Sequence, residues 1–422
     1  GLYDYEAFPE LARFGLVDYD WSNGKRAWAN LSPMDADGML VEQAARNKVE
    51  NPAARVFVYR NIVKALPWYT EVRELLQEQA SWGFFLPYEG CRTSTGDYVC
   101  KNKVTGDVDA TANLYHDEEQ TPGWTGGGDG GPDGVCHGDT KGNNASGPTQ
   151  SGYCDCGAGV SCGEYLWDHR NGSELTRWFT EQYIGGDKYG LGNANVDGFF
   201  LDDYWVGDKP SEEAWPCSPR GTGAGRCAGL KPQDTAEMKA SWEVNMAAVE
   251  AAIVQKGGFA WQSFHCIDGS DDSGIGCATN TPSKGASCAS FLRDSCQAES
   301  MVQTSAMQYK ISHEFVRDYA AINLTNFDMD LGIFLASRGN FSWLGYGWLG
   351  CGCGWEHDAK MPCDIYQRPA ALNKDYGVPM GLCHETGPER SGVFVREWTK
   401  STVTVDCNAY TSDIQMKKPH VE

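Results

Sequence analysis

The sequence predicts an α/β protein, a (β/α)8 TIM barrel with long disulfide-rich loop insertions. Short apolar runs alternate with amphipathic helical patterns along the chain about eight times, which is typical of this barrel. Several runs are apolar on successive residues, as expected of parallel strands buried on both faces. The length of 422 residues suffices for one barrel with insertions, and a two-domain α/β protein is the structural alternative.

Eight short apolar runs are the expected strands. The second and third lie close together, and insertions follow the third, fourth and fifth. The expected strands cover residues 16–20, 56–61, 82–87, 196–203, 259–264, 331–338, 343–349 and 393–398.

Amphipathic helices are expected between the strands. Ser32-Pro33 resembles an N-cap followed by a first-turn proline, and predicts a helix that runs to Lys48. The stretches 66–79 and 173–184 place leucines and aromatic residues on one face at helical spacing. A longer helix over 235–256 stops at Gly257-Gly258.

Three insertions interrupt the alternation, and we expect residues 1–422 to form a single barrel domain around them. Residues 88–165 are rich in cysteine and glycine, and the segments 206–230 and 266–296 are also rich in cysteine. In a barrel these loops follow strands three, four and five, on the face where binding and catalysis occur.

Cysteine content and glycosylation triplets indicate the compartment. Seventeen cysteines favour disulfides formed in an oxidising environment, and the odd count leaves at least one thiol free or paired with another chain. Together with five N-glycosylation triplets, the cysteines predict a secreted eukaryotic glycoprotein, extracellular or at the cell surface. Because the chain starts at Gly1 and shows no signal peptide, we expect it to be the processed form. The candidate N-glycosylation sites are Asn30, Asn144, Asn171, Asn323 and Asn340.

The acidic composition disfavours two classes of partner. Asp and Glu number 57 against 35 Lys and Arg, a formal net charge of −22. Such a chain repels phosphate backbones and anionic lipid, so we expect no nucleic acid partner. We also expect no membrane insertion, because no apolar run approaches the length of a membrane-spanning helix.

No metal and no cofactor are expected. The clusters Cys154-Asp-Cys156 and Cys351-Gly-Cys353 lack the second half of a zinc site and are interpreted as disulfides. Residues 107–118 match the ligand spacing of an EF-hand, but Ala112 stands where that loop needs glycine. A phosphate-binding loop, a dinucleotide fingerprint and a serine-nucleophile elbow are all absent.

The segment 196–205 carries the strongest candidate for chemistry. It is a hydrophobic strand that ends in Asp202 and Asp203, and strand alternation puts Asp202 on the face of Gly198 and Phe200. A carboxylate at a barrel mouth can protonate a leaving oxygen, attack a sugar carbon or activate water. A salt-bridged strand end or a glycan-binding aspartate is the structural alternative.

Glycoside hydrolysis needs a second carboxylate on the other side of the scissile bond. Asp18 and Asp20 share one face at the end of the first strand, and Glu397 ends the last strand. Because barrel strands one and eight are neighbours, Asp20 or Glu397 is the candidate catalytic partner of Asp202, and surface ion pairing explains either residue equally well.

Other polar and aromatic residues at strand ends are candidates for substrate binding. Arg60 and Asn61 can hold hydroxyl groups, or can form a buried hydrogen-bond network that ties loops to the barrel. Aromatic rings stack on the apolar faces of sugars, although core packing explains any single ring. The substrate-binding candidates are Asp18, Asp203, Arg60, Asn61, Tyr204, Trp205 and Trp348.

Five segments carry a resemblance to known proteins, and they cover residues 18–24, 56–68, 198–203, 343–348 and 393–400. Together they resemble the glycosyl-hydrolase-like TIM-barrel family of secreted proteins. The resemblance implies a glycoside-hydrolase-like barrel with an acid after strand four, and a short C-terminal edge strand at 403–405.

Two functions of different classes remain open. The first is a secreted glycoside hydrolase that uses Asp202 and a second carboxylate on a polysaccharide. The second is a non-catalytic structural glycoprotein, a barrel subunit that assembles into an extracellular filament or coat, with the odd cysteine as one means of self-assembly. A carbohydrate-binding module without turnover is a third option.

Overall fold

In the computed structural model the chain divides into two compact units, residues 1–263 and 264–422, and each has its own sheet and core. The structure describes residues 12, 14–21, 25–29, 31–86, 114, 155–161, 164–170, 172–203, 205–206, 209–210, 232–262, 285–298, 304–309, 327–339, 341–346 and 369–418.

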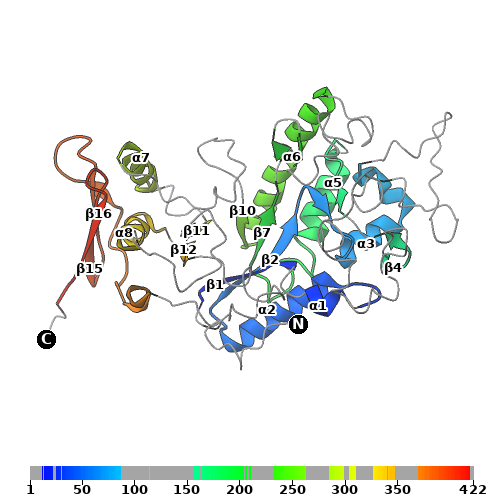
Figure 1. Ribbon diagram of the computed structural model, residues 1–422, viewed down its shortest axis with the longest axis horizontal. Helices are drawn as coiled ribbons and strands as arrows, with labels where there is room; N and C mark the ends of the chain where they lie inside the picture. The colour runs from blue at the N-terminus through cyan, green and yellow to red at the C-terminus, as the bar shows by residue number, and fades with distance from the viewer. Residues whose placement is uncertain are drawn as a thin grey trace, which may run out of the picture. The chain divides into compact units, whose positions relative to one another are not determined.

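The first unit is built on a four-stranded parallel sheet. Its strands β1 (Leu16–Tyr19), β2 (Arg55–Asn61), β7 (Gly198–Asp202) and β10 (Phe259–Gln262) lie side by side in this order (Figure 1). All residues of β2 after the first are buried, because both faces of the sheet are covered. The α/β class, the parallel sheet and four of the expected strands are therefore confirmed, whereas closure into a barrel stays a prediction.

Gly198 shows why the middle of this sheet needs a glycine. A Cβ atom at this position would lie 2.3 Å from the carbonyl oxygen of Phe259 and 2.7 Å from the ring of Phe57. The missing side chain lets β2, β7 and β10 keep their register while two phenylalanine rings fill the space beside the strand.

The helices of the first unit fall close to the predicted positions. α2 (Ala36–Glu50) begins later than Ser32-Pro33 predicts, because Asp35 caps it by accepting the N–H of Gly38 at 3.0 Å. α6 (Pro232–Gln255) ends just before Gly257-Gly258, as predicted, and Gly257 has a left-handed backbone with φ 72°. The other helices are α1 (Lys25–Trp28), α3 (Thr70–Gln77) and α5 (Gly172–Trp178), which continues as a π-helix over Phe179–Tyr183.

The prediction of a strand over 82–87 is wrong. The segment forms a 3₁₀ helix (Gln79–Phe84), followed by a single bridge from Phe85 to Trp167. Phe85 and Leu86 are buried, and a short apolar run indicates burial without fixing the backbone conformation. The short strands of this unit are β3 (Lys64–Ala65), β4 (Asp155–Gly157), β5 (Val160–Ser161), β6 (Tyr165–Leu166), β8 (Trp205–Val206) and β9 (Lys209–Pro210).

The second unit contains a parallel pair of strands, β11 (Thr304–Tyr309) and β12 (Phe341–Tyr346). β12 matches an expected strand, whereas β11 was not predicted. The prediction of a strand over 331–338 is wrong, because this segment belongs to helix α8 (Phe327–Ser337). Every residue of α8 except Asp328 is buried. Its stretch from Leu331 to Ala336 is apolar without a break, so the sequence there has no polar face that distinguishes a buried helix from a buried strand.

A four-stranded antiparallel sheet completes the second unit, in the order β13 (His384–Glu385), β14 (Val393–Glu397), β15 (Ser401–Asp406) and β16 (Thr411–Met416). β14 was expected as the eighth parallel barrel strand. That prediction is wrong, because antiparallel partners occupy both of its edges. The segment 403–405 is a strand as expected, but it lies between β14 and β16 and is not the edge strand.

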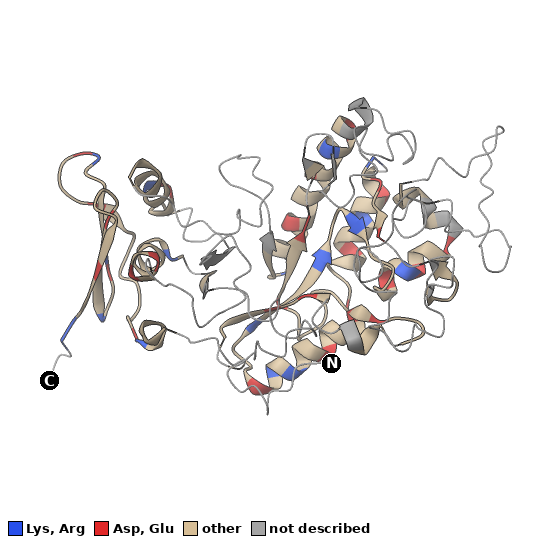
Figure 2. Ribbon diagram, viewed as in Figure 1, with Lys and Arg blue, Asp and Glu red and all other residues tan. Residues whose placement is uncertain are grey.

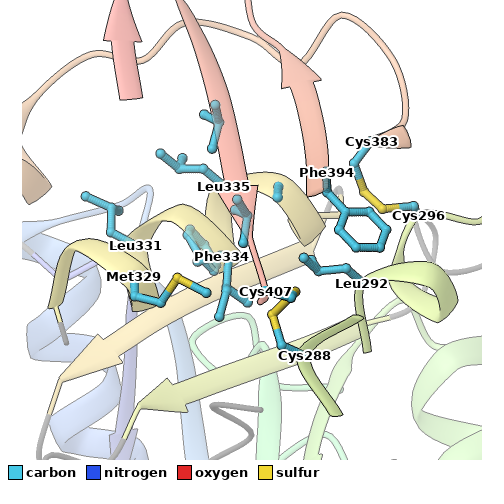
Figure 3. Close-up of a cluster of buried hydrophobic side chains, with 14 of the residues drawn as sticks. Cys288, Leu292, Cys296, Met329, Leu331, Phe334, Leu335, Cys383, Phe394 and Cys407 are labelled. Atoms are coloured by element: carbon cyan, nitrogen blue, oxygen red, sulfur yellow. A yellow bond between two sulfur atoms is a disulfide. The ribbon is translucent and has the colours of Figure 1, made fainter. Parts of the chain in front are cut away.

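The core of the second unit packs α7 (Ala286–Ser295) and α8 with this antiparallel sheet (Figure 3). Two disulfides, Cys288–Cys407 and Cys296–Cys383, join α7 and the residue after it to the sheet region (Figure 3). The interpretation of these cysteines as disulfides is confirmed. Both bonds are compatible with an oxidising compartment.

Charged residues tie the amino-terminal edge of the first sheet together. Acidic and basic positions are interspersed along α2 (Figure 2), where Glu42 and Arg46 form an ion pair one turn apart. Just before β7, the Asp197 carboxylate forms an ion pair with the Arg55 guanidinium at 2.9 Å and a second one with Lys48. No described helix is both long and apolar enough to cross a membrane.

Candidate functional site

The candidate site lies at the carboxyl ends of β1, β2 and β7 in the first unit. The parallel register places Asp18 beside Phe57, Tyr59 beside Phe200, and Asn61 beside Asp202. Side chains at paired positions of a parallel sheet point to the same side, so these residues share one face. The prediction that Asp202 lies on the face of Gly198 and Phe200 agrees with this register.

Asp202 is held through both carboxylate oxygens. The Tyr59 hydroxyl donates to Oδ2 at 2.7 Å, and the backbone N–H of Asp203 donates to Oδ1 at 2.9 Å. Neighbouring parallel strands thus bring together a tyrosine and an aspartate that are 143 residues apart in sequence. Tyr59 was not among the candidates, although its position two residues before Asn61 puts it on the same face.

Burial is the main cause that raises the pKa of Asp202 to about 7. The negative charges of Asp203 and Asp20 act in the same direction, while the Tyr59 hydrogen bond and Lys64 oppose them. A carboxyl group with this pKa holds its proton through much of the neutral range and can give it to a leaving group.

Asp18 and Asp20 join this group from β1. Burial raises the pKa of Asp18 well above its usual value, and the charges of Asp20 and Asp202 add to the effect. The charge of Asp20 also acts on Asp202 and Tyr59. The structure therefore brings together the carboxyl groups of the first and fourth predicted strands, close enough for each to affect the protonation of the others.

Asp203 and Lys64 form the polar rim of the site. Lys64 Nζ lies 3.0 Å from Glu164 and 3.4 Å from Asp203 Oδ2. Burial acts to lower the pKa of Lys64, but the two carboxylates outweigh burial and raise it. Asp203 adopts a left-handed backbone with φ 62°, a conformation that side chains with a Cβ rarely take and that is concentrated at functional sites.

Arg60 lies on the opposite face of β2, away from Asp202. It is fully buried, and its guanidinium donates to the backbone oxygens of Tyr59, Tyr183 and Tyr189 at 2.9–3.3 Å. Its Nη1 lies 3.4 Å from Asp37 in α2. These contacts favour the network that ties loops to the sheet over the binding of substrate hydroxyls, because strand alternation turns Arg60 away from Tyr59 and Asn61.

His169 holds the turn that follows β2. The sequence did not predict this role. Its Nε2 lies 2.7 Å from the carbonyl oxygen of Ile62, so Nε2 carries the proton, and Nδ1 accepts from the Asn245 amide at 2.9 Å. Burial lowers the pKa of His169 to about 3. A single histidine before a helix carries no sequence signal for this role.

Glu397 is in the second unit, at the end of β14. Lys417 lies 2.7 Å from its carboxylate and Thr402 donates to it at 2.9 Å, and these two contacts lower its pKa. Glu397 is exposed on an antiparallel strand, which favours the surface ion pair that was its alternative interpretation.

The remaining candidates divide into buried and undescribed residues. Trp205 is buried in β8, and its indole N–H has no hydrogen-bond partner among the described residues. The residues that lie outside the described part of the chain are Tyr204, Trp348, Asn30, Asn144, Asn171, Asn323 and Asn340, together with all of 107–118 except Leu114.

Within the described residues, no group of three or more His, Cys, Asp or Glu side chains is arranged to hold a metal ion. The Asp202 carboxyl group contacts a hydroxyl and a backbone amide, and that of Asp203 contacts a side-chain amide and an ammonium group. Such an arrangement can support proton transfer by one carboxyl group beside another that stays ionised.

Comparisons with known proteins give little guidance. No family model matches the chain. No curated protein matches it. One solved structure that matches is alpha-L-fucosidase isoenzyme 2 from Paenibacillus thiaminolyticus, at 12% sequence identity and a TM-score of 0.34. The match covers 83% of this chain and 43% of that one, so this chain spans less than half the length of the fucosidase.

Proposed function

We propose that this protein is a secreted glycoside hydrolase that cleaves glycosidic bonds in a polysaccharide by carboxylate acid/base catalysis. One observation carries the proposal: Asp202 ends a buried parallel strand, is gripped through both oxygens, and has a pKa raised to about 7 beside other carboxyl groups. Active sites of parallel α/β folds form at the carboxyl ends of the strands.

In this proposal Asp202 is the general acid. Its proton passes to the glycosidic oxygen as the bond to the anomeric carbon breaks, and the leaving sugar departs with a hydroxyl group. Asp20 is the second carboxylate, which either attacks the anomeric carbon or takes a proton from the attacking water. Since Asp20 raises the pKa of Asp202, an ionised Asp20 helps to keep the acid protonated.

The other predicted features extend the same proposal. The parallel sheet of the first unit belongs to a (β/α)8 barrel whose mouth lies at the carboxyl ends of β1, β2 and β7. Asp18, Asp203 and Tyr204 contact the bound sugar. The glycosylation triplets and further disulfides belong to a protein that acts outside the cell. A non-catalytic filament or coat subunit is the alternative if turnover is absent.

The test is release of reducing ends from a panel of neutral, acidic and amino-sugar polysaccharides. We expect Asp202→Asn and Asp20→Asn each to reduce kcat at least about 100-fold. Asp197→Asn is the matched control, because it removes a carboxylate at the other end of β7, where Arg55 and Lys48 pair with it. Activity in Asp202→Asn at the level of the control would refute the proposal.

A further inference from the structure

Asn61, the last residue of β2, is fully buried and uses all of its hydrogen-bonding capacity within the protein. Its Oδ1 accepts the backbone N–H groups of Val63 at 2.9 Å and Lys64 at 2.7 Å. Only the oxygen of a side-chain amide can accept, so these two bonds fix which way the amide faces. The nitrogen must face Tyr59 and Asp203.

The first N–H of Asn61 sets the direction of the Tyr59 hydroxyl. Asn61 Nδ2 donates to the Tyr59 oxygen at 2.9 Å, so that contact takes a lone pair of the phenol. The single hydroxyl proton is then left to point at Asp202 Oδ2, 2.7 Å away. A donated hydrogen bond of this kind favours the ionised carboxylate.

The second N–H of Asn61 acts on the other oxygen of Asp202. Asn61 Nδ2 donates to Asp203 Oδ2 at 2.7 Å, next to the Lys64 ammonium at 3.4 Å from the same oxygen. These contacts hold the side chain of Asp203, whose backbone is in the left-handed region. From that conformation the Asp203 N–H donates to Asp202 Oδ1.

We infer that Asn61 is a positioning residue that controls both oxygens of Asp202, one through Tyr59 and the other through Asp203. This role rests on the proposed function, and it replaces the binding of a substrate hydroxyl by Asn61, because no donor or acceptor of the amide is left for a ligand. Since each oxygen of Asp202 already accepts one bond, the acid proton lies on a lone pair that faces neither Tyr59 nor the Asp203 amide.

The titration of Asp202 tests this role without any substrate. Infrared difference spectra of protein carrying ¹³C-labelled aspartate follow the carboxyl band that is missing in Asp202→Asn. Asn61→Asp keeps the shape and the accepting oxygen but removes both donors, and Asn61→Ser removes them without adding a charge. We expect both variants to move the Asp202 midpoint to higher pH, because the ionised form loses its support.

Two further variants test whether Asn61 acts through its hydrogen bonds, and not through an added charge or a general disturbance of the fold. If Asn61 acts through Tyr59, the shift caused by Asn61→Ser becomes smaller in a Tyr59→Phe background. Asn47→Asp is the matched control. Asn47, in α2, is also fully buried, and it donates to a tyrosine hydroxyl, that of Tyr19 in β1, at 3.1 Å. Asn47→Asp should leave the Asp202 midpoint unchanged.

The inference is overturned if folded Asn61→Ser titrates like the unsubstituted protein, or if only Asn61→Asp shifts the midpoint, which a charge effect alone would produce. If Asn61→Ser shifts the Asp202 midpoint equally with and without the Tyr59 hydroxyl, the part of the inference that acts through Tyr59 is also overturned. Hydrolysis is a separate readout. If the unsubstituted protein and all variants lack turnover, the proposed function fails, but the titration of Asp202 still decides the role of Asn61.

Discussion

The hydroxyl of Tyr59 donates a 2.7 Å hydrogen bond to Asp202, and the two residues come from neighbouring parallel strands. The same contact affects both partners: it opposes the rise in the pKa of Asp202, and with burial and nearby carboxylates it raises the pKa of Tyr59. The tyrosine therefore stays protonated and keeps donating over the range in which Asp202 titrates.

Two substitutions beside Asp202 should shift its titration in opposite directions. Tyr59→Phe removes a bond that stabilises the ionised carboxylate, so the pKa of Asp202 rises. Asp203→Asn removes a negative neighbour, so the pKa falls. If Asp202 is the general acid, activity declines as pH rises through about 7. This decline should move to higher pH in Tyr59→Phe and to lower pH in Asp203→Asn. Shifts of the same sign in both variants would contradict this assignment.

Glu71 should weaken the first unit at alkaline pH. Burial and the charge of Asp37 raise its pKa to about 8, and its Oε2 has no hydrogen-bond partner among the described residues. Between pH 4.5 and 8 the folded form binds more protons than the unfolded form, so the free energy of unfolding falls as pH rises. We expect Glu71→Gln to stabilise the unit by about 1–3 kcal/mol at pH 9 and to have little effect at pH 4.

Hydrogen exchange of the β2 peptides measures this effect in the first unit alone. Glu74→Gln is the control on the same helix, because Glu74 is exposed. If Glu71→Gln raises the free energy of unfolding equally at pH 4 and pH 9, the cause of the stabilisation is packing and not ionisation.

His169 should have the opposite pH dependence. Its pKa is lowered from 6.5 to about 3, so the unfolded form binds more protons below pH 6.5 and the unit loses stability as pH falls toward 3. His169→Gln should cost about 1–3 kcal/mol at pH 7, since it breaks the bonds to Ile62 and Asn245. The difference in the free energy of unfolding between His169→Gln and the unsubstituted protein should become smaller as pH is lowered to 4. A difference that stays constant in hydrogen exchange would argue against a buried neutral imidazole.

The sequence predicted the parallel strands of the first unit because runs such as Val56–Tyr59 are apolar on successive residues, and strand parity correctly placed Asp202. It failed at α8, where the continuous apolar stretch 331–336 resembles a buried strand, and at β14, where the direction of strand pairing has no local signal. The Lys64–Glu164 pair joins residues far apart in the chain, so only the fold could reveal it. Arg60 is a different case, because the parity that placed Asp202 also separates Arg60 from Asn61.

The disulfides should carry much of the stability of the second unit. Cys288–Cys407 closes a separation of 119 residues, and Cys296–Cys383 one of 87. Replacing Cys288 and Cys407 by serine should reduce the free energy of unfolding by about 2–5 kcal/mol, because the unfolded chain regains the freedom of a long loop. Hydrogen exchange of peptides from β15 tests this, and exchange rates equal to those of the unsubstituted protein would rule it out.

The most direct measurement is the rate of reducing-end release from a cleaved polysaccharide by the unsubstituted protein, Asp202→Asn and Asp197→Asn, side by side at pH 6. The account predicts a loss of at least about 100-fold in Asp202→Asn, with KM little changed, and near-normal kcat in Asp197→Asn once the folded fraction is matched. Equal rates in the two variants, or no hydrolysis of any polysaccharide by the unsubstituted protein, would contradict it.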